Sequence, residues 1–150
     1  MKMSKEMERI LELQKTETPK ESITRRQLIT VSRPDMLLGH RSGVNWAAVG
    51  SVEPAFAEAF GQAMKIASAQ AREMDAAAAH LGIPKREARG MAGLVEVEAP
   101  DTMLKRSARV NWHAIGEVSA AEAEVFGDDL LAAASKALEL DAEMAGARAI

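Results

Sequence analysis

The stretch VNWAAVGSV at residues 44–52 recurs as VNWHAIGEV at residues 110–118. The offset between them is 66 residues, and the two tryptophans of the chain occupy equivalent positions. At the same offset, residues 29–80 align with residues 95–146 without a gap. Rare residues coincide along this alignment, so chance is a poor explanation for the match. We therefore infer that the second half of the chain duplicates the first.

Each copy predicts two β-strands. The first is expected at residues 28–33 and 94–99, where apolar and polar side chains alternate with the period of a half-buried strand. A Pro-Asp pair follows in both copies and favours a turn. The second strand is expected at residues 44–50 and 110–116, where valine, tryptophan, alanine and glycine recur at every second place. These shared residues predict the strand face that is turned to the core.

A long helix is expected after each second strand. Pro54 suits the first turn of one helix, and Ser119 suits the N-cap of the other. Gly61 and Gly127 lie mid-helix at matched positions, where a glycine costs about 1 kcal/mol relative to alanine. The matched glycines predict a close approach, either between the two helices or between helix and sheet, which a leucine at either position would overpack.

These elements predict an α+β fold made of tandem duplicated ββα units. We expect one four-stranded antiparallel sheet with pseudo-twofold symmetry and both helices on one face, because a lone hairpin is only marginally stable. A short additional helix is expected at residues 3–16. The predicted division is an N-terminal helical arm at residues 1–26, a first repeat at residues 27–82, a linker at residues 83–93 and a second repeat at residues 94–150. The two repeats are expected to form one compact domain.

The composition indicates a soluble protein without disulfides, a secretory signal or a membrane span. The 150 residues include 47% hydrophobic residues and carry a net charge of -3, which suits one soluble domain. No cysteine is present, so disulfides and thiolate metal sites are excluded. The first 20 residues lack the apolar core of a secretory signal, and no stretch approaches the ~18 apolar residues of a membrane span. We therefore expect a cytoplasmic protein with no membrane partner.

The second strand of each copy also predicts a partner surface. Its face away from the core carries Asn45, Ala47 and Val49 in the first copy and Asn111, His113 and Ile115 in the second. The apolar middle of this face favours contact with protein, either a second copy of this chain or a larger assembly. Coverage by residues 1–26 is the alternative that the sequence leaves open. The two asparagines are either a symmetric recognition pair or partners of backbone groups at the sheet edge.

The loops before the second strands are basic. Candidate phosphate contacts are Arg41 in the first copy and Lys105, Arg106 and Arg109 in the second. These residues make a nucleic-acid-binding protein the alternative function. Glu96 and Glu98 on the neighbouring strand, the negative net charge and the lack of aromatic residues for base stacking favour a solvated loop instead.

No catalytic motif occurs in the sequence. A phosphate-binding glycine loop, a nucleophile elbow and a Walker motif are absent, and the three histidines lack metal-ligand spacing. We therefore expect no enzyme activity, no metal and no cofactor. The leading hypothesis is a non-catalytic protein-interaction or structural module. A small-molecule site in the groove between the two helices is a third hypothesis.

Overall fold

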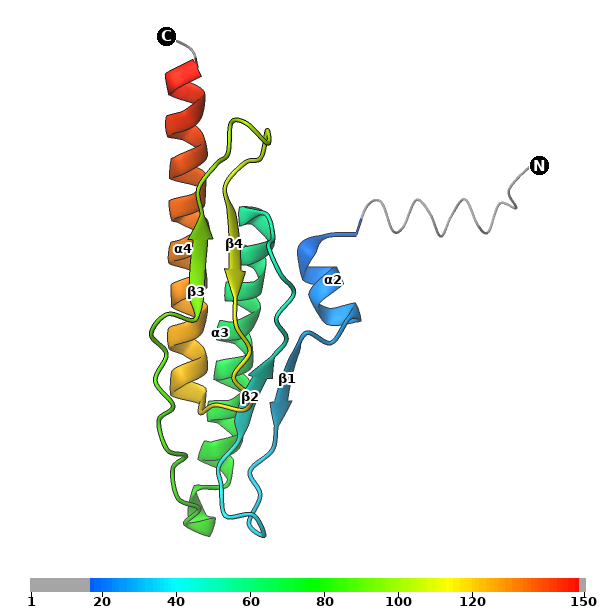
Figure 1. Cartoon of the computed structure of the whole chain (residues 1–150). Helices are drawn as coiled ribbons and strands as arrows, with labels where there is room; N and C mark the ends of the chain where they lie inside the picture. Colours follow the sequence, from blue (N-terminus) through cyan, green and yellow to red (C-terminus); the bar gives the residue numbers. More distant parts are fainter. Residues whose placement is uncertain (1–16, 149–150) are drawn as a thin grey trace, which may run out of the picture.

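The computed structural model of this chain describes residues 17–148, and the helix predicted at residues 3–16 lies outside this range. Along the chain the elements are α2 (Pro19–Arg25), β1 (Ile29–Ser32), β2 (Gly43–Trp46), α3 (Pro54–Ala77), the 3₁₀ helix η1 (Ala79–Leu81), β3 (Val95–Glu98), β4 (Arg109–Trp112) and α4 (Ala120–Arg148) (Figure 1). The predicted α+β class is confirmed.

The four strands form two separate antiparallel sheets, so the prediction of a single four-stranded sheet is wrong. β1 pairs with β2, and β3 pairs with β4. Isolated backbone pairs join the two hairpins, Val44 to Val118 and Val52 to Val110. One continuous sheet would need a ladder between β2 and β4. Each of these strands instead pairs with the segment that leads from the other hairpin into its helix.

The second strand of each hairpin ends earlier than the sequence pattern predicts. β2 ends at Trp46 and β4 ends at Trp112, whereas the pattern predicts strands to Gly50 and Gly116. These glycines have φ angles of +82° and +84°, in the left-handed region, so the backbone leaves the extended conformation there. The prediction that this strand face is buried is therefore confirmed as far as Trp46 and Trp112, and it is wrong at Ala48, which is exposed.

The two long helices, α3 and α4, pack against each other in opposite directions (Figure 1). α3 begins with Pro54, and α4 follows Ser119, whose Oγ accepts a hydrogen bond from the Glu122 N–H at 3.2 Å. Both predicted helix starts are confirmed. A Cβ on Gly61 would lie 2.9 Å from the carbonyl oxygen of Gly127, and the converse distance is also 2.9 Å. The predicted close approach is therefore between the two helices.

The core lies between this helix pair and the two hairpins. Trp46 and Trp112 are each 3% exposed, which confirms that they are core residues. Trp46 stacks on Phe126 with the ring centroids 4.0 Å apart. Trp112 packs on Phe60 with the ring centroids 4.5 Å apart. Each tryptophan thus contacts the helix that follows the other hairpin.

The indole groups of the same two tryptophans also join the hairpins. Trp46 Nε1 donates a hydrogen bond to the His113 carbonyl at 2.9 Å. Trp112 Nε1 donates one to the Ala47 carbonyl at 2.9 Å. A buried indole N–H needs an acceptor, and here the acceptor is a backbone group of the opposite hairpin.

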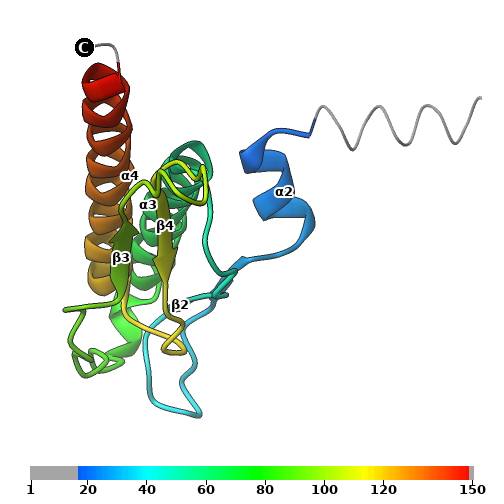
Figure 2. The same cartoon turned by 45° about the horizontal axis from the view of Figure 1, so that its top comes forward.

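The two hairpins point to opposite ends of the molecule. Figure 1 shows the turn between β1 and β2 at the lower end and the turn between β3 and β4 towards the upper end, and Figure 2 shows the same separation after rotation. α2 packs against α3 and buries Ile23. None of the helices within residues 17–148 has both the length and the apolar character needed to cross a membrane.

Candidate functional site

The turns of the two hairpins carry large apolar side chains in solvent. They are Met36, Leu37 and Leu38 between β1 and β2, here called the first tip, and Met103 and Leu104 between β3 and β4, here called the second tip. Leu37 is 98% exposed and Met103 is 92% exposed, so neither contributes to the core. These two residues occupy positions 66 apart, the offset of the sequence repeat.

An aspartate holds the backbone of each tip. Asp35 Oδ1 accepts hydrogen bonds from two N–H groups of the first tip at 2.9 and 3.0 Å. Asp101 Oδ1 accepts two from the second tip at 2.9 and 3.1 Å. The backbone of each aspartate also pairs with the residue that closes the turn, His40 in the first hairpin and Arg106 in the second. Both tips are therefore ordered turns that present apolar side chains.

Sequence reasoning missed the tips. It predicts the two turns from their Pro-Asp pairs but assigns no role to the residues that follow. The signal was the apolar run itself, because Gly, Asn, Asp, Ser and Pro dominate tight turns. The other large apolar residues that are exposed within residues 17–148 lie in helices: Ile66 on α3, Leu81 on η1, and Val125 and Leu138 on α4.

The four predicted phosphate contacts are divided between the two hairpins. Arg41 lies in the first hairpin, where its Nε donates to a linker carbonyl at 3.0 Å. Lys105 and Arg106 follow the second tip and are exposed. Arg109 begins β4 and donates to the Ser51 carbonyl at 2.8 Å. Two of the four side chains are thus bound to backbone oxygens, and the four do not form one basic surface.

The predicted partner face is divided as well. Asn45 and Asn111 lie in different sheets. The residues of the set that pack partly against the core are Ala47, Val49 and Ile115. His113 is exposed just beyond the end of β4. The structure therefore does not bring these six residues together on one open strand face.

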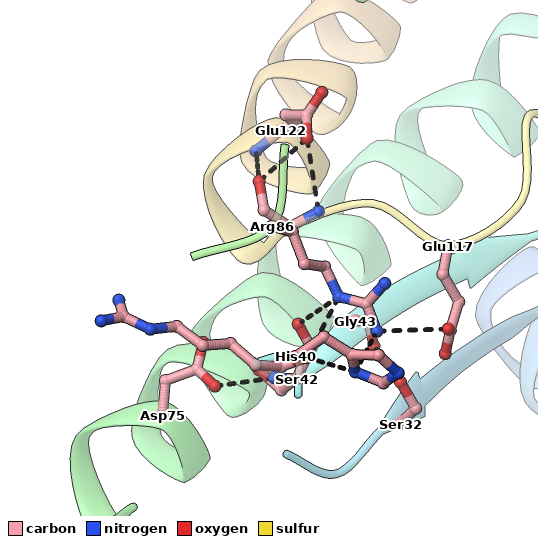
Figure 3. A network of polar contacts seen from close by, with 10 residues as sticks. Ser32, His40, Ser42, Gly43, Asp75, Arg86, Glu117 and Glu122 are labelled. Carbon is pink, nitrogen blue, oxygen red and sulfur yellow. Dashed lines mark hydrogen bonds and ion pairs between the residues drawn. The ribbon is translucent and has the colours of Figure 1, made fainter. Parts of the chain in front are cut away.

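A polar network centred on Arg86 ties the linker to the first hairpin (Figure 3). Arg86 Nε donates to the Arg41 carbonyl at 3.0 Å. Its Nη2 donates to His40 Nδ1 at 2.9 Å and to Glu117 Oε2 at 3.2 Å. Gly43 leaves room for this guanidinium, since a Cβ there would lie 2.9 Å from Nη2. The linker is therefore attached to the first hairpin through Arg86, in addition to the hydrogen bond from Arg41 to the Ile83 carbonyl.

The pKa of Glu117 lies below its ordinary value. A hydrogen bond from the Ser32 hydroxyl is the largest cause, and the charge of Arg86 adds to it, while partial burial opposes both. Folding thus favours the ionised carboxylate, which is the form that accepts from Arg86.

Two further aspartates join the hairpins to the helices. Asp75 Oδ1 accepts from the Ser42 N–H at 2.8 Å, and Asp141 Oδ1 accepts from the Ala108 N–H at 2.6 Å. These carboxylates therefore fix each hairpin to the C-terminal half of the helix that follows it. In the part of the chain that the structure describes, no group of three or more His, Cys, Asp or Glu side chains could hold a metal ion.

Comparison with known proteins adds no relative to this picture. No family model matches the chain, and no curated protein or solved structure matches it significantly. A proposal for the function of this chain must therefore rest on its own structural features, chiefly the exposed tips and the docked linker.

Proposed function

We propose that this chain is a non-catalytic protein-interaction module whose two tips are its docking elements. The observation that carries the proposal is that each tip holds large apolar side chains in solvent on a turn already ordered by an aspartate. An ordered turn loses little conformational entropy on binding. Apolar side chains that do not serve the core gain free energy when a partner covers them.

The size of a tip predicts weak binding at each end. Burying one leucine or methionine side chain contributes about 1.5–3 kcal/mol. Two such side chains at the second tip contribute about 3–6 kcal/mol, and three at the first tip about 4.5–9 kcal/mol, which is comparable to the cost of association, about 4 kcal/mol or more. Useful affinity then depends on engaging both tips at once, which raises the effective concentration at the second. The module is thus suited to bridge two linked sites of one assembly.

We further infer that the two halves are duplicated ββα units related by an approximate twofold axis, as in a homodimer fused into one chain. Support comes from contacts that occur in pairs, each at the 66-residue offset. The pairs are Val44–Val118 with Val52–Val110, Trp46–His113 with Trp112–Ala47, and the reciprocal approach of Gly61 and Gly127. Such an arrangement accounts for two like tips at opposite ends.

The nucleic-acid alternative has less support from the basic residues. Only Lys105 and Arg106 of the four candidates are exposed, and both lie in the turn between β3 and β4. Two phosphate contacts provide little affinity at physiological salt. We therefore expect no change in molar mass by light scattering when a short DNA duplex is added. A gain in mass at low salt that Lys105→Ala and Arg106→Ala abolish would favour nucleic acid instead.

The tips are tested directly by affinity purification of the full chain from its native cells. We expect a discrete protein, either a second copy or another chain, to be retained by the parent and lost with Leu37→Ser combined with Met103→Ser. Ile66→Ser is the matched control, because it removes an exposed apolar side chain from a helix. Retention of the same protein by the tip variant would contradict the proposal.

A further inference from the structure

The two long helices end differently. α3 stops at Ala77, and the chain turns through η1 and Gly82, whose φ is +64°. Ile83 follows and is buried at 7% exposure, with its carbonyl accepting from Arg41 Nε at 3.0 Å. Arg86 then completes the attachment through His40 (Figure 3). The linker from residue 82 to residue 86 thus lies against the first hairpin near the end of α3. It leaves there a smaller hollow of about 280 Å³, whose lining includes Arg41, Asp75, Lys85 and Arg86.

The equivalent surface of the second half is open. α4 remains helical to Arg148, past the positions that correspond to η1. A hollow of about 620 Å³ lies between α4 and the second hairpin. Its lining is Pro100, Thr102, Lys105, Arg106, Ser107, Asp141, Met144 and Ala145. Within residues 17–148, no residue of the linker is among those that line this groove, whereas Lys85 and Arg86 of the linker line the hollow of the first half.

The two surfaces are built alike but differ in charge. Asp75 and Asp141 hold the two hairpins by equivalent hydrogen bonds. Arg106 replaces His40, the residue that accepts from Arg86. A second arginine at the place of Arg86 would therefore be repelled, whereas a carboxylate would be attracted.

A second substitution also disfavours an arginine in the open groove. Arg109 stands where the first half has Gly43, the residue that leaves room for the Arg86 guanidinium. In the second half, Arg109 Nη2 donates to the Ser51 carbonyl. In the first half, the residue that corresponds to Ser51 is Glu117, which accepts from Arg86 Nη2. In the second half, the guanidinium of Arg109 thus lies where the first half binds the guanidinium of Arg86 from the linker.

We propose that the groove between α4 and the second hairpin binds an extended acidic peptide segment of a partner protein. An apolar side chain of that segment takes the place of Ile83 against Met144, and a carboxylate near the place of Arg86 pairs with Lys105 and Arg106. The proposal goes beyond the docking tips and uses other residues. It rests on the correspondence between the two halves given under the proposed function.

The test uses methionine-methyl and amide NMR of the full chain with two synthetic peptides. One copies residues 82–88, GIPKREA, and the other has glutamate in place of Lys85 and Arg86. We expect the acidic peptide to shift the Met144 methyl and the amides of residues 105–107, with an affinity at least ~10-fold higher than that of the first peptide, equivalent to about 1.4 kcal/mol. Arg106→Glu should reverse the preference.

Several outcomes would overturn the proposal. Equal binding of the two peptides, or no shift of Met144 with either at millimolar concentration, would do so. A Met144 resonance that moves on deletion of residues 1–16 would assign the groove to the chain's own N-terminal segment. One that moves with protein concentration would assign it to a second copy. Leu37→Ser and Met103→Ser leave the groove lining intact, so failure of the tip hypothesis and failure of this one are distinguishable.

Discussion

Replacing Gly61 by alanine places a methyl group against a backbone that cannot rotate away. The new Cβ would lie 2.9 Å from the Gly127 carbonyl oxygen and 3.0 Å from Leu131 Cγ. Alanine gains about 1 kcal/mol over glycine in a helix interior. Overpacking costs typically 1–3 kcal/mol, and the upper part of that range applies because the closest atom belongs to the facing backbone. We therefore expect a net destabilisation of about 1–2 kcal/mol.

Urea unfolding followed by circular dichroism measures this change in the free energy of unfolding. Gly127→Ala should cost a similar amount, since its Cβ would lie 2.9 Å from the Gly61 carbonyl oxygen. The double variant should cost less than the sum, because one separation of the helices relieves both contacts. Gly146→Ala is the matched control, with nothing within 4 Å of its Cβ, and should not destabilise. Gly61→Ala as stable as the parent would refute the close helix crossing.

Three further substitutions test the remaining contacts. Trp46→Phe removes the donor to the His113 carbonyl and should lower the free energy of unfolding by about 1–3 kcal/mol, seen as a lower urea midpoint; an unchanged midpoint would refute a role for this bond. Glu117→Gln should destabilise the protein at pH 7 and much less at pH 3. A carboxyl whose pKa is lowered by folding stabilises the fold above its ordinary pKa, and this stabilisation is lost as the pH falls through the lowered pKa. A loss of stability that is the same at both pH values would contradict this expectation. Asp35→Ala removes the acceptor of two N–H groups of the first tip. Hydrogen exchange of those two amides should become faster while the core amides stay protected. Unchanged exchange in the tip would show that Asp35 does not order it.

Much of the local structure follows from sequence pattern because it depends on near neighbours. Alternation predicts where the strands begin, and Pro54 and Ser119 mark the helix starts. The matched glycines at positions 61 and 127 predict close packing. These features are set by helix capping, strand periodicity and backbone freedom.

The sheet arrangement could not be predicted in this way, because it depends on pairing between distant segments. Val52 and Val118 pair with strands of the opposite hairpin, and their own surroundings in the sequence carry no sign of it. The docked linker is a similar case, since Arg86 binds Glu117, which lies beyond β4. The tips were missed for a different reason: their apolar residues are exposed within residues 17–148, so they do not belong to the core that strand and helix periodicity predicts.

Site-specific photo-crosslinking tests the docking role of the tips most directly. Benzoylphenylalanine is placed at Leu37, at Met103 or, as a control, at Ile66 in the full chain, and irradiation is carried out in the native cells. We expect a discrete protein adduct from each tip position and none from Ile66. No adduct from either tip, or the same adducts from all three positions, would contradict the docking role of the tips.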